Sequence, residues 1–356
     1  MILQRLVLTN FRSYPSLDLT FGERANLIVG DNASGKTNLA EAITYLSLVR
    51  SWRTLEEENL IAFGATYASM RAFVREGSLN REILIEFTPE GKRVSLNGKP
   101  LRRMSELSRL VNVLLFTPGD VRLFKGPPSD RRAFLDVSLC KRSADYLALI
   151  SRQAALLKSR NALLKDGGRD RELLEVLTGQ LIDVEEPIVR YRTMYVTSLN
   201  AILPKVLGSL RGEQTACALV YRPFARDDGS FKEKARKLYR DSLEGDILHK
   251  ATSVGTHRED FSFRLDGKDV AEFGSQGENR MAALALKLAP YFLIEEEERK
   301  PICVLDDVTS ELDAQNAGRL LAYLNLLGQS FLTATHLTLP GASVIEVADH
   351  NAHRRN

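Results

Sequence analysis

Cysteine is scarce in this sequence, and its distribution excludes two classes of small stabilised protein. Among 356 residues there are three cysteines, Cys140, Cys217 and Cys303, and no two of them form a Cys-x-x-Cys pair. An odd number of widely separated cysteines excludes a disulfide scaffold and a cysteine-rich zinc site, and it is typical of a reducing compartment. We therefore expect a cytoplasmic protein.

Long apolar runs are also missing. None approaches the roughly 18–20 residues that a membrane-spanning helix needs, so we expect no membrane partner. Arg5 and Arg12 interrupt the apolar stretch that a signal peptide requires, and export is not expected either. With 44% hydrophobic and 27% charged residues the chain can still build a core. Its length gives a prior of about two domains.

The net charge of +3 is small, but it conceals an uneven distribution. Residues 121–250 contain 24 Lys or Arg and 17 Asp or Glu, a net charge of +7, while the rest of the chain has a net charge of −4. A basic middle section suggests an anionic partner for that part of the chain. A solvated helical surface would give the same pattern, so charge alone does not decide between them.

Hydrophobic periodicity predicts strands near both ends and helices in the middle. The predicted strands are 3–9, 17–21, 25–29, several within 65–116, 216–221, 260–273, 302–305, 330–334 and 344–347. The predicted helices are 36–50, 143–165, 177–202, 231–243, 276–289 and one between the strands at 302–305 and 330–334. Asn97-Gly98 favours a type I′ hairpin, and Pro187 should kink or break its helix.

The clearest motif is Gly30-Asp31-Asn32-Ala33-Ser34-Gly35-Lys36-Thr37, which fits the pattern Gly-x4-Gly-Lys-Ser/Thr. It follows a predicted strand and opens a predicted helix, which is the setting of a phosphate-binding Walker A loop. The inward-pointing N–H groups of the loop and the helix N-terminus would bind phosphates. Lys36 would contact the β- and γ-phosphates, and the Thr37 hydroxyl would bind Mg²⁺.

A pair of carboxylates lies near the other end of the chain. The apolar strand 302–305 is followed by Asp306 and Asp307. Asp306 is placed to bind Mg²⁺ as in a Walker B motif, and Asp307 to orient or deprotonate an attacking water. A buried strand ending in solvated acids is the alternative, but two motifs together favour a nucleotide site. Since they lie about 270 residues apart, a large insertion separates them.

A third motif precedes the Walker B strand by about 30 residues. Ser275-Gln276-Gly277-Glu278 comes directly before a helix rich in Ala and Leu, where Ser275 alone would be an ordinary N-cap. In this order the three motifs resemble those of ABC-type ATPases, and this segment resembles their signature motif. Ser310-Glu311-Leu312-Asp313 is similar to the D-loop of that superfamily, and Thr335-His336 is similar to its switch.

Longer segments narrow the resemblance to the bacterial RecF family of recombination mediators. Residues 8–14 are similar to the opening of RecF and SMC proteins, and Asn38 extends the Walker A motif in the same style. Residues 126–136 resemble a RecF segment Gly-x-Pro-x-x-Arg-Arg-x-Phe-Leu-Asp, and residues 253–260 resemble a segment Gly-x-His-Arg-Asp-Asp.

Four residues depart from these patterns. Glu259 replaces an Asp of the second RecF segment, which is a mild change. Gly119 stands where the RecF family usually has an acid, Glu278 where the signature carries Gln, and Asp307 where fast ABC ATPases have Glu. A carboxylate at 278 would weaken a contact with γ-phosphate unless it faces away. The shorter side chain of Asp307 suggests slow hydrolysis.

The resemblance implies an ABC-type ATPase that uses ATP and Mg²⁺ and forms an ATP-dependent homodimer. Ser275 and Gly277 of one copy would cap the γ-phosphate that Lys36 of the other copy binds. His336 would be the switch residue, and Arg12 is a further candidate near the nucleotide.

The resemblance also implies binding to single-stranded, gapped or junction DNA. It further implies that the protein acts with RecO and RecR to load RecA during DNA repair, replication restart and the SOS response. A weak, DNA-stimulated ATP hydrolysis is implied as well. Lys and Arg bind phosphates without sequence preference, so the basic middle section supports a DNA partner. The candidate contacts are Arg102, Arg103, Arg131, Arg132, Lys141 and Arg142. Arg131 and Arg132 could instead pair with Asp130 and Asp136 on one helix.

Three other interpretations explain less. A transporter ATPase subunit leaves the insertion, the basic middle section and the RecF-like segments unaccounted for. An SMC-type tether needs sustained heptads, but the insertion contains β segments, Pro187 and Pro204. A metabolic P-loop kinase leaves the signature motif unaccounted for.

The expected fold is an α/β ABC-type ATPase head of two lobes. Residues 1–116 with 296–356 would form lobe I, which combines mixed and antiparallel sheets with the Walker A, Walker B and D-loop motifs. Residues 117–295 would form lobe II, which is mainly helical and carries the signature motif.

Overall fold

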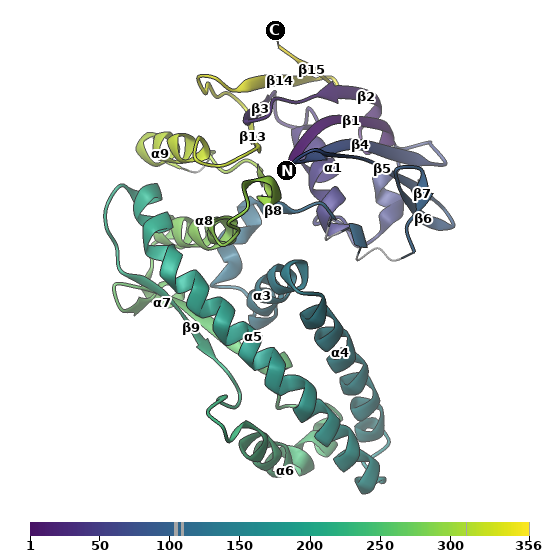
Figure 1. Cartoon of the computed structure of the whole chain (residues 1–356), viewed down its shortest axis with the longest axis vertical. Helices are drawn as coiled ribbons and strands as arrows, with labels where there is room; N and C mark the ends of the chain where they lie inside the picture. Colours follow the sequence, from purple (N-terminus) through teal and green to yellow (C-terminus); the bar gives the residue numbers. More distant parts are fainter. Residues whose placement is uncertain (103–105, 108–109, 311, 356) are drawn as a thin grey trace. The chain divides into compact units, whose positions relative to one another are not determined.

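The computed structural model of the chain describes residues 1–102, 106–107, 110–310 and 312–355. The chain forms two compact units, shown with the elements labelled in Figure 1. Unit 1 comprises Met1–Val121, Lys205–Gln214 and Ala283–Asn356, and unit 2 comprises Arg122–Pro204 and Thr215–Ala282. Unit 1 differs from the predicted lobe I in two main ways. It includes the signature helix from Ala283 onward, and it includes the segment Lys205–Gln214 from the middle of the chain. No described helix is long and apolar enough to cross a membrane.

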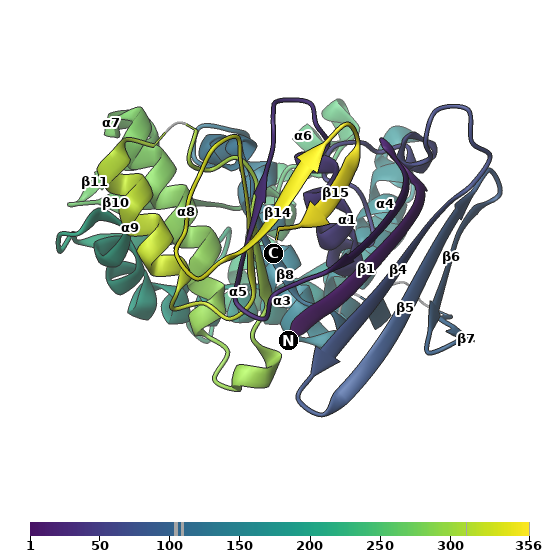
Figure 2. The ribbon, with the colours of Figure 1, turned by 90° about the horizontal axis from the view of Figure 1, so that it is seen from above.

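Unit 1 contains a six-stranded antiparallel sheet in the order β2-β1-β4-β5-β6-β7, and Figure 2 labels its strands β1, β4, β5, β6 and β7. Its strands are β1 Ile2–Phe11, β2 Tyr14–Thr20, β4 Ala68–Glu76, β5 Leu79–Thr88, β6 Gly91–Leu96 and β7 Lys99–Pro100. Leu96 pairs with Lys99 across a two-residue loop in which Asn97 and Gly98 both have positive φ. This confirms the predicted type I′ hairpin, because that turn needs positive φ at both positions.

A second sheet of unit 1 is parallel except at one edge, in the order β15-β14-β3-β13-β12-β8. Its strands are β3 Ala25–Val29, β8 Val113–Phe116, β12 Ile302–Leu305, β13 Ser330–Ala334, β14 Ser343–Ala348 and β15 Asn351–Arg354. Strand β3, from the start of the chain, pairs with both β13 and β14 from its end. All residues of β12 and β13 are buried, as expected for parallel strands covered on both faces.

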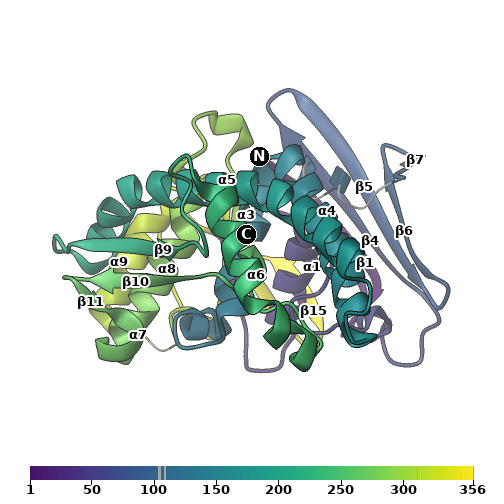
Figure 3. The ribbon, with the colours of Figure 1, turned by 90° about the horizontal axis from the view of Figure 1, so that it is seen from below.

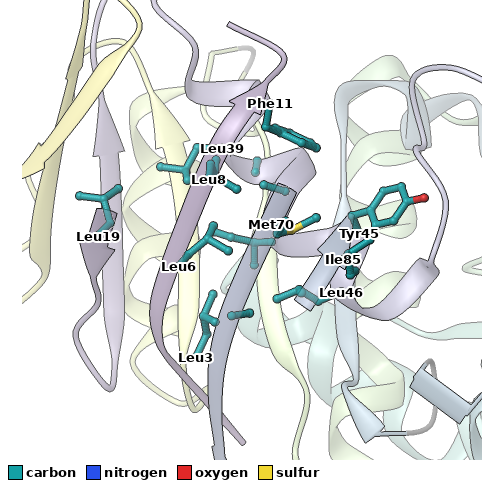
Figure 4. Packing of buried hydrophobic residues seen from close by; sticks show 14 of the residues in the cluster. Leu3, Leu6, Leu8, Phe11, Leu19, Leu39, Tyr45, Leu46, Met70 and Ile85 are labelled. Atoms are coloured by element: carbon teal, nitrogen blue, oxygen red, sulfur yellow. The ribbon is translucent and has the colours of Figure 1, made fainter. Parts of the chain in front are cut away.

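Helix α1 (Lys36–Leu48) packs against the antiparallel sheet and forms the core of unit 1. Figure 4 shows Leu39, Tyr45 and Leu46 of α1 beside the inward-facing side chains of β1, β4 and β5. These side chains have no exposed surface, and burial of each one stabilises the fold by about 1.5–3 kcal/mol. The burial of α1 on nearly all sides explains why it starts and ends with few charged residues.

Unit 2 combines long helices with a small sheet, as Figure 3 shows from below. Its helices are α3 Pro128–Arg142, α4 Ala144–Lys165, most of α5 Arg171–Arg211, α6 Phe231–His249, α7 Val270–Phe273 and the start of α8 Gln276–Phe292. Its sheet has the order β11-β10-β9, with β9 Cys217–Arg222, β10 Asp260–Leu265 and β11 Lys268–Asp269. Helix α9 Ala314–Leu324 belongs to unit 1.

Of the two outcomes predicted for Pro187, a kink or a break, the break does not occur, because α5 runs without interruption from Arg171 to Arg211. A proline inside a helix leaves the carbonyl four residues earlier without its usual donor. Here that carbonyl belongs to Asp183, an exposed residue, so water can replace the donor. The buried side chains of Ile182 and Ile188 hold the helix on either side of the proline. Tertiary packing therefore outweighs the local penalty.

The two RecF-like segments meet inside unit 2 in a buried ionic network. Arg192 of α5 is almost fully buried and pairs with Asp136 from the first segment at 2.9 Å and with Glu259 from the second at 2.7 Å. Tyr221 also donates to Glu259, and burial raises the pKa of that carboxyl above its ordinary value. Asp136 and Glu259, which belong to the RecF-like segments, thus stabilise the fold of unit 2.

A second buried ion pair holds the residues that precede the second RecF-like segment, 253–260. Arg160 of α4 donates to Asp246 at 2.8 Å and to the hydroxyl of Thr252 at 2.7 Å. The carbonyl of Thr252 in turn lies 3.1 Å from His257 Nε2 and accepts a hydrogen bond from Arg258. Charged side chains of α3, α4, α5 and α6, namely Arg132, Arg160, Arg192 and Asp246, therefore attach residues 252–259 to four helices.

Replacing Arg192 with Ala should lower the free energy of unfolding by about 3–5 kcal/mol, because it leaves the buried Glu259 and its neighbour Asp136 without a counter-ion. Urea denaturation followed by circular dichroism measures the change. Arg190→Ala is the matched control, since Arg190 lies on the same helix in an exposed pair with Asp227 and should leave the midpoint nearly unchanged. Equal midpoints for the two variants would contradict a stabilising role for the network.

Candidate nucleotide-binding site

The Walker A loop connects β3 to α1 and is packed tightly on its neighbours. A Cβ atom on Gly30 would lie 2.1 Å from the carbonyl oxygen of Val347 in β14, so only glycine fits there. Gly35 has a φ of 119°, and a Cβ atom on it would lie 2.9 Å from the hydroxyl of Tyr14. That hydroxyl donates to the Gly35 carbonyl at 3.0 Å. These contacts hold the loop in one conformation at the start of a helix, where its N–H groups can bind an anion.

Lys36 folds its side chain back over the loop. Its ammonium group donates to the carbonyls of Gly30 and Asp31, each at 2.7 Å. Burial lowers the pKa of Lys36, and the nearby carboxylates of Asp307, Asp306 and Asp31 oppose that shift. The cation therefore lies where phosphate oxygens would meet the loop, and the predicted proximity of Lys36 to both Walker B carboxylates is present.

Asp306 at the end of β12 meets the first turn of α1. Thr37 Oγ1 donates to Asp306 Oδ1 at 3.3 Å, although the two residues are 269 positions apart. Thr333 of β13 donates to the same oxygen at 2.8 Å and accepts the Asp307 backbone N–H at 2.8 Å. Burial raises the pKa of Asp306, and the two hydroxyl hydrogen bonds oppose the shift. One buried threonine thus holds the Asp306 carboxylate and the Asp307 backbone, a role that the sequence did not predict.

The residues present fit a Mg²⁺–nucleotide complex. Ser34 Oγ is buried without a hydrogen-bond partner in the described part of the chain, so the loop contains an unused polar group. Thr37 and Asp306 offer two oxygen ligands, and Mg²⁺ commonly takes one or two protein oxygens and completes its shell with phosphates and water. Within residues 1–102, 106–107, 110–310 and 312–355, no group of three or more His, Cys, Asp and Glu side chains is placed to hold a metal alone.

Arg12, a predicted neighbour of the nucleotide, contacts the helix that follows the Walker A loop. Its guanidinium group makes two hydrogen bonds to the buried Glu41, at 2.9 and 2.7 Å, and a third to the Asn59 carbonyl. Glu41 also pairs with Arg53 at 3.2 Å, and Arg53 donates to the side chain of Asn38 at 2.6 Å. Arg12 therefore braces α1 in this structure.

Arg53 is a residue that the sequence analysis missed. The side chain is partly exposed and lies on the first turn of α1, and its charge opposes the upward shift that burial produces in the pKa of Asp306. No motif marked it, because residues 50–60 form a loop and a short 3-10 helix whose position follows from contacts with α1.

The signature segment belongs to unit 2 up to Ala282 and forms a reciprocal cap. Ser275 Oγ accepts a hydrogen bond from the Glu278 N–H at 3.2 Å, and Glu278 Oε2 accepts one from the Ser275 N–H at 2.8 Å. This is a capping box, and it shows where the unusual Glu278 carboxylate goes. Gly277 is exposed beside it.

The two motifs that follow Walker B lie in loops of unit 1. His336 is exposed two residues after β13. In the D-loop segment, Asp313 caps α9 by accepting a hydrogen bond from Asn316 at 2.8 Å, and Glu311 lies outside the described residues.

Of the arginines predicted to contact DNA, Arg131 has a different role. It is buried and pairs with Asp260 at 2.6 Å, while its remaining N–H groups donate to the carbonyls of Leu123, Phe124 and Gly126. Its guanidinium group is therefore committed inside unit 2, and the partner is Asp260 instead of Asp130 or Asp136. This correction follows from the fold, which brings α3 to β10.

The other residues predicted to contact DNA are more accessible than Arg131, except that Arg103 is not among the described residues. Arg132 is partly exposed and donates to the Glu259 carbonyl at 2.8 Å, and Arg102 is exposed. Arg142 lies over the ring of Tyr195 at 5.9 Å. Lys141 is partly buried, and Arg103 lies outside the described residues.

Comparison with known proteins places this arrangement in a family. The sequence model described as "RecF/RecN/SMC N terminal domain" matches residues 2–339. The chain is 36% identical over 363 residues to the DNA replication and repair protein RecF of an Exiguobacterium species, covering 98% of this chain and 97% of that protein. The chain belongs to the RecF family. A RecF of Lactobacillus delbrueckii subsp. bulgaricus is 35% identical, covering 95% of this chain and 91% of the relative.

Solved RecF structures share the whole fold. The structure titled "Structure of the recombination mediator protein RecF-ATP in RecFOR pathway" is similar with a TM-score of 0.90 and 31% identity, covering 100% of this chain and 98% of that chain. An SMC head bound to the C-winged helix domain of ScpA is similar with a TM-score of 0.62 at 16% identity, which shows the fold alone. The fold is thus the expected ABC-type ATPase head, as in RecF and SMC proteins.

Thr333→Val should reduce Mg²⁺-dependent ATP hydrolysis by about 10- to 100-fold, because the variant keeps the shape of the side chain but removes the hydroxyl that orients Asp306 and Asp307. ATP turnover measured across a Mg²⁺ titration tests this. Thr333→Ser keeps the hydroxyl and should retain most of the activity. A valine variant as active as wild type would show that the threonine does not position the carboxylates.

Proposed function

We propose that the chain is an ATP-dependent, DNA-binding recombination mediator of the RecF type. The observation that carries the proposal is the convergence of Lys36, Thr37 and Asp306 from opposite ends of the chain on a RecF fold. The name of a solved relative, a recombination mediator bound to ATP in the RecFOR pathway, supports the same activity here.

The nucleotide site divides its work among few residues. The Walker A N–H groups bind the phosphates, Lys36 leaves its loop carbonyls for the β- and γ-phosphates, and Thr37 with Asp306 holds Mg²⁺. Mg²⁺, when bound, supplies charge neutralisation for the phosphates. Asp307, next to Lys36, orients the attacking water, and its short side chain makes hydrolysis slow, so the ATP state is long-lived.

Dimerisation completes the site. The Ser275 turn and the start of α8 from one copy cap the γ-phosphate held by Lys36 of a second copy, because a helix N-terminus favours an anion. The Asn279 side-chain amide supports this turn by donating to the carbonyls of Val270, Gly274 and Ser275. Because the turn is already ordered, binding a phosphate there costs little further conformational entropy.

DNA binding rests on the basic surface of unit 2. Helix α6 exposes a row of cations, of which Lys232 pairs with Asp183 and Lys234 with Asp228. The described residues provide no ion-pair partner for the others, Arg236, Lys237 and Arg240, which can bind DNA phosphates at gaps or junctions without sequence preference. Arg102, Arg132, Lys141 and Arg142 remain candidates. With RecO and RecR, the clamped dimer promotes RecA loading in repair, replication restart and SOS induction, and DNA weakly stimulates ATP turnover.

Ser275→Arg should abolish ATP-dependent dimerisation, because a long cationic side chain obstructs the turn that faces the γ-phosphate. Light scattering with and without ATP measures the mass. Ser209→Arg is the control, since Ser209 is an exposed serine of α5 that bonds only to its own helix. Asp307→Asn should slow hydrolysis and keep the dimer. A protein that stays monomeric with ATP in wild-type and Asp307→Asn forms would overturn the dimer.

Replacing Arg236, Lys237 and Arg240 together with Ala should weaken binding to gapped DNA and reduce the slope of log K against log salt by about 2–3, because each phosphate contact contributes about 0.9. Fluorescence anisotropy at several salt concentrations gives the slope. Lys232→Ala with Lys234→Ala is the control on the same helix, where the charges are already paired. An unchanged slope in the triple variant would remove α6 from the DNA surface.

A further inference from the structure

A large apolar side chain lies in solvent beside the signature turn. Phe273 is the last residue of the short helix α7 and is 70% exposed. It precedes Ser275, which begins the signature motif, by two positions. A single exposed apolar residue is ordinary on a protein surface. The position of this ring and the rigidity of its backbone are what distinguish it.

The backbone that carries Phe273 is fixed on both sides of the ring. Val270, at the start of α7, is buried. A Cβ atom on Gly274 would lie 2.5 Å from the Val270 carbonyl oxygen, so the chain after the ring closes tightly on α7. The buried Asn279 also donates to the carbonyls of Val270, Gly274 and Ser275. The ring is therefore presented to solvent by an ordered turn, which is how aromatic anchors of protein interfaces are held.

The proposed ATP dimer determines what lies opposite the ring. In that dimer Ser275 of one copy caps the γ-phosphate that Lys36 of the other copy binds, so the second copy's Walker A loop meets the signature turn. Two residues of extended chain span at most about 7 Å, and the ring of Phe273 is thus within reach of the surface around that loop. Residues 31–33 of the loop are exposed in the single copy and offer such a surface.

We infer that Phe273 is an apolar anchor for a second copy of this chain. In the single copy the ring lies in water, and in the ATP dimer it is buried against the rim of the other copy's Walker A loop. Because the two copies are equivalent, two rings are buried, one beside each ATP. This inference rests on the proposed capping of one copy's ATP by the other copy's Ser275, and it adds a contact that involves no phosphate.

Phe273→Ser should weaken ATP-dependent dimerisation and leave the thermal unfolding midpoint unchanged, because the ring contacts mainly solvent in the single copy. Truncation of a buried aromatic anchor weakens an interface by about 30-fold or more. The apparent Kd for dimerisation at saturating ATP should therefore rise at least about 30-fold, measured by light scattering across a protein dilution series. Leu248→Ser is the matched control, since Leu248 is another large apolar residue of unit 2, 76% exposed near the end of α6. It should dimerise like wild type.

A second variant tests whether the ring itself becomes covered. The chain has one tryptophan, Trp52, so Phe273→Trp in a Trp52→Phe background carries a single fluorescent reporter at the position of the ring. Its emission should move to shorter wavelength with ATP at protein concentrations where the dimer forms, because the indole leaves water. At concentrations where the protein stays monomeric, ATP should leave the emission unchanged. A ring that serves only the fold of α7 would show no dependence on protein concentration.

The outcomes separate this inference from the function on which it rests. If wild type dimerises with ATP and Ser275→Arg does not, the capping of ATP by a second copy stands, and the Phe273 variants then test the anchor alone. A Phe273→Ser protein that dimerises like wild type would overturn the anchor. An equal loss in Leu248→Ser, or an emission that dimerisation leaves unchanged, would overturn it as well. A wild type that never dimerises with ATP would overturn both the dimer and the anchor.

Discussion

The pairing of β3 with β13 and β14 is the constraint on which the rest of unit 1 depends. It inserts a strand from the start of the chain between strands from its end, and β12 follows on the far side of β13. Because these strands are parallel, their carboxyl ends lie at one edge of the sheet, where ligands bind in such folds. The Walker A loop leaves β3 at that edge and Asp306 ends β12 there, so Thr37 and Asp306 meet.

Charged residues serve two separate purposes in this chain. Inside unit 2, Arg192 and Arg131 are buried against carboxylates of the two RecF-like segments, 126–136 and 253–260. On the surface of the same unit, α6 displays cations to solvent. A buried ion pair contributes little net stability but is costly to break, because one partner alone leaves an unpaired charge. The most recognisable RecF segments thus preserve a fold, and unremarkable surface lysines and arginines are available for phosphates.

Patterns with a short range could be predicted from the sequence, and contacts between distant residues could not. The Gly-x4-Gly-Lys-Thr spacing is sufficient to place Lys36 and Thr37, and the turn at Asn97-Gly98 follows from its own φ preferences. Thr333 has no motif, because its importance comes from the strand pairing that sets it beside Asp306. The contacts of Arg12 and Arg131 and the continuity of α5 through Pro187 could not be predicted for the same reason, since a buried partner or a packed helix face decides them.

The interleaved sheet also has a consequence for how the protein is made. A ribosome releases β3 and the Walker A loop early, but their neighbours β13 and β14 emerge only after nearly the whole chain has been synthesised. Until then both edges of β3 lack partners, and unpaired edges invite association with other chains. An unfinished chain therefore lacks both Asp306 and the strands that frame the loop.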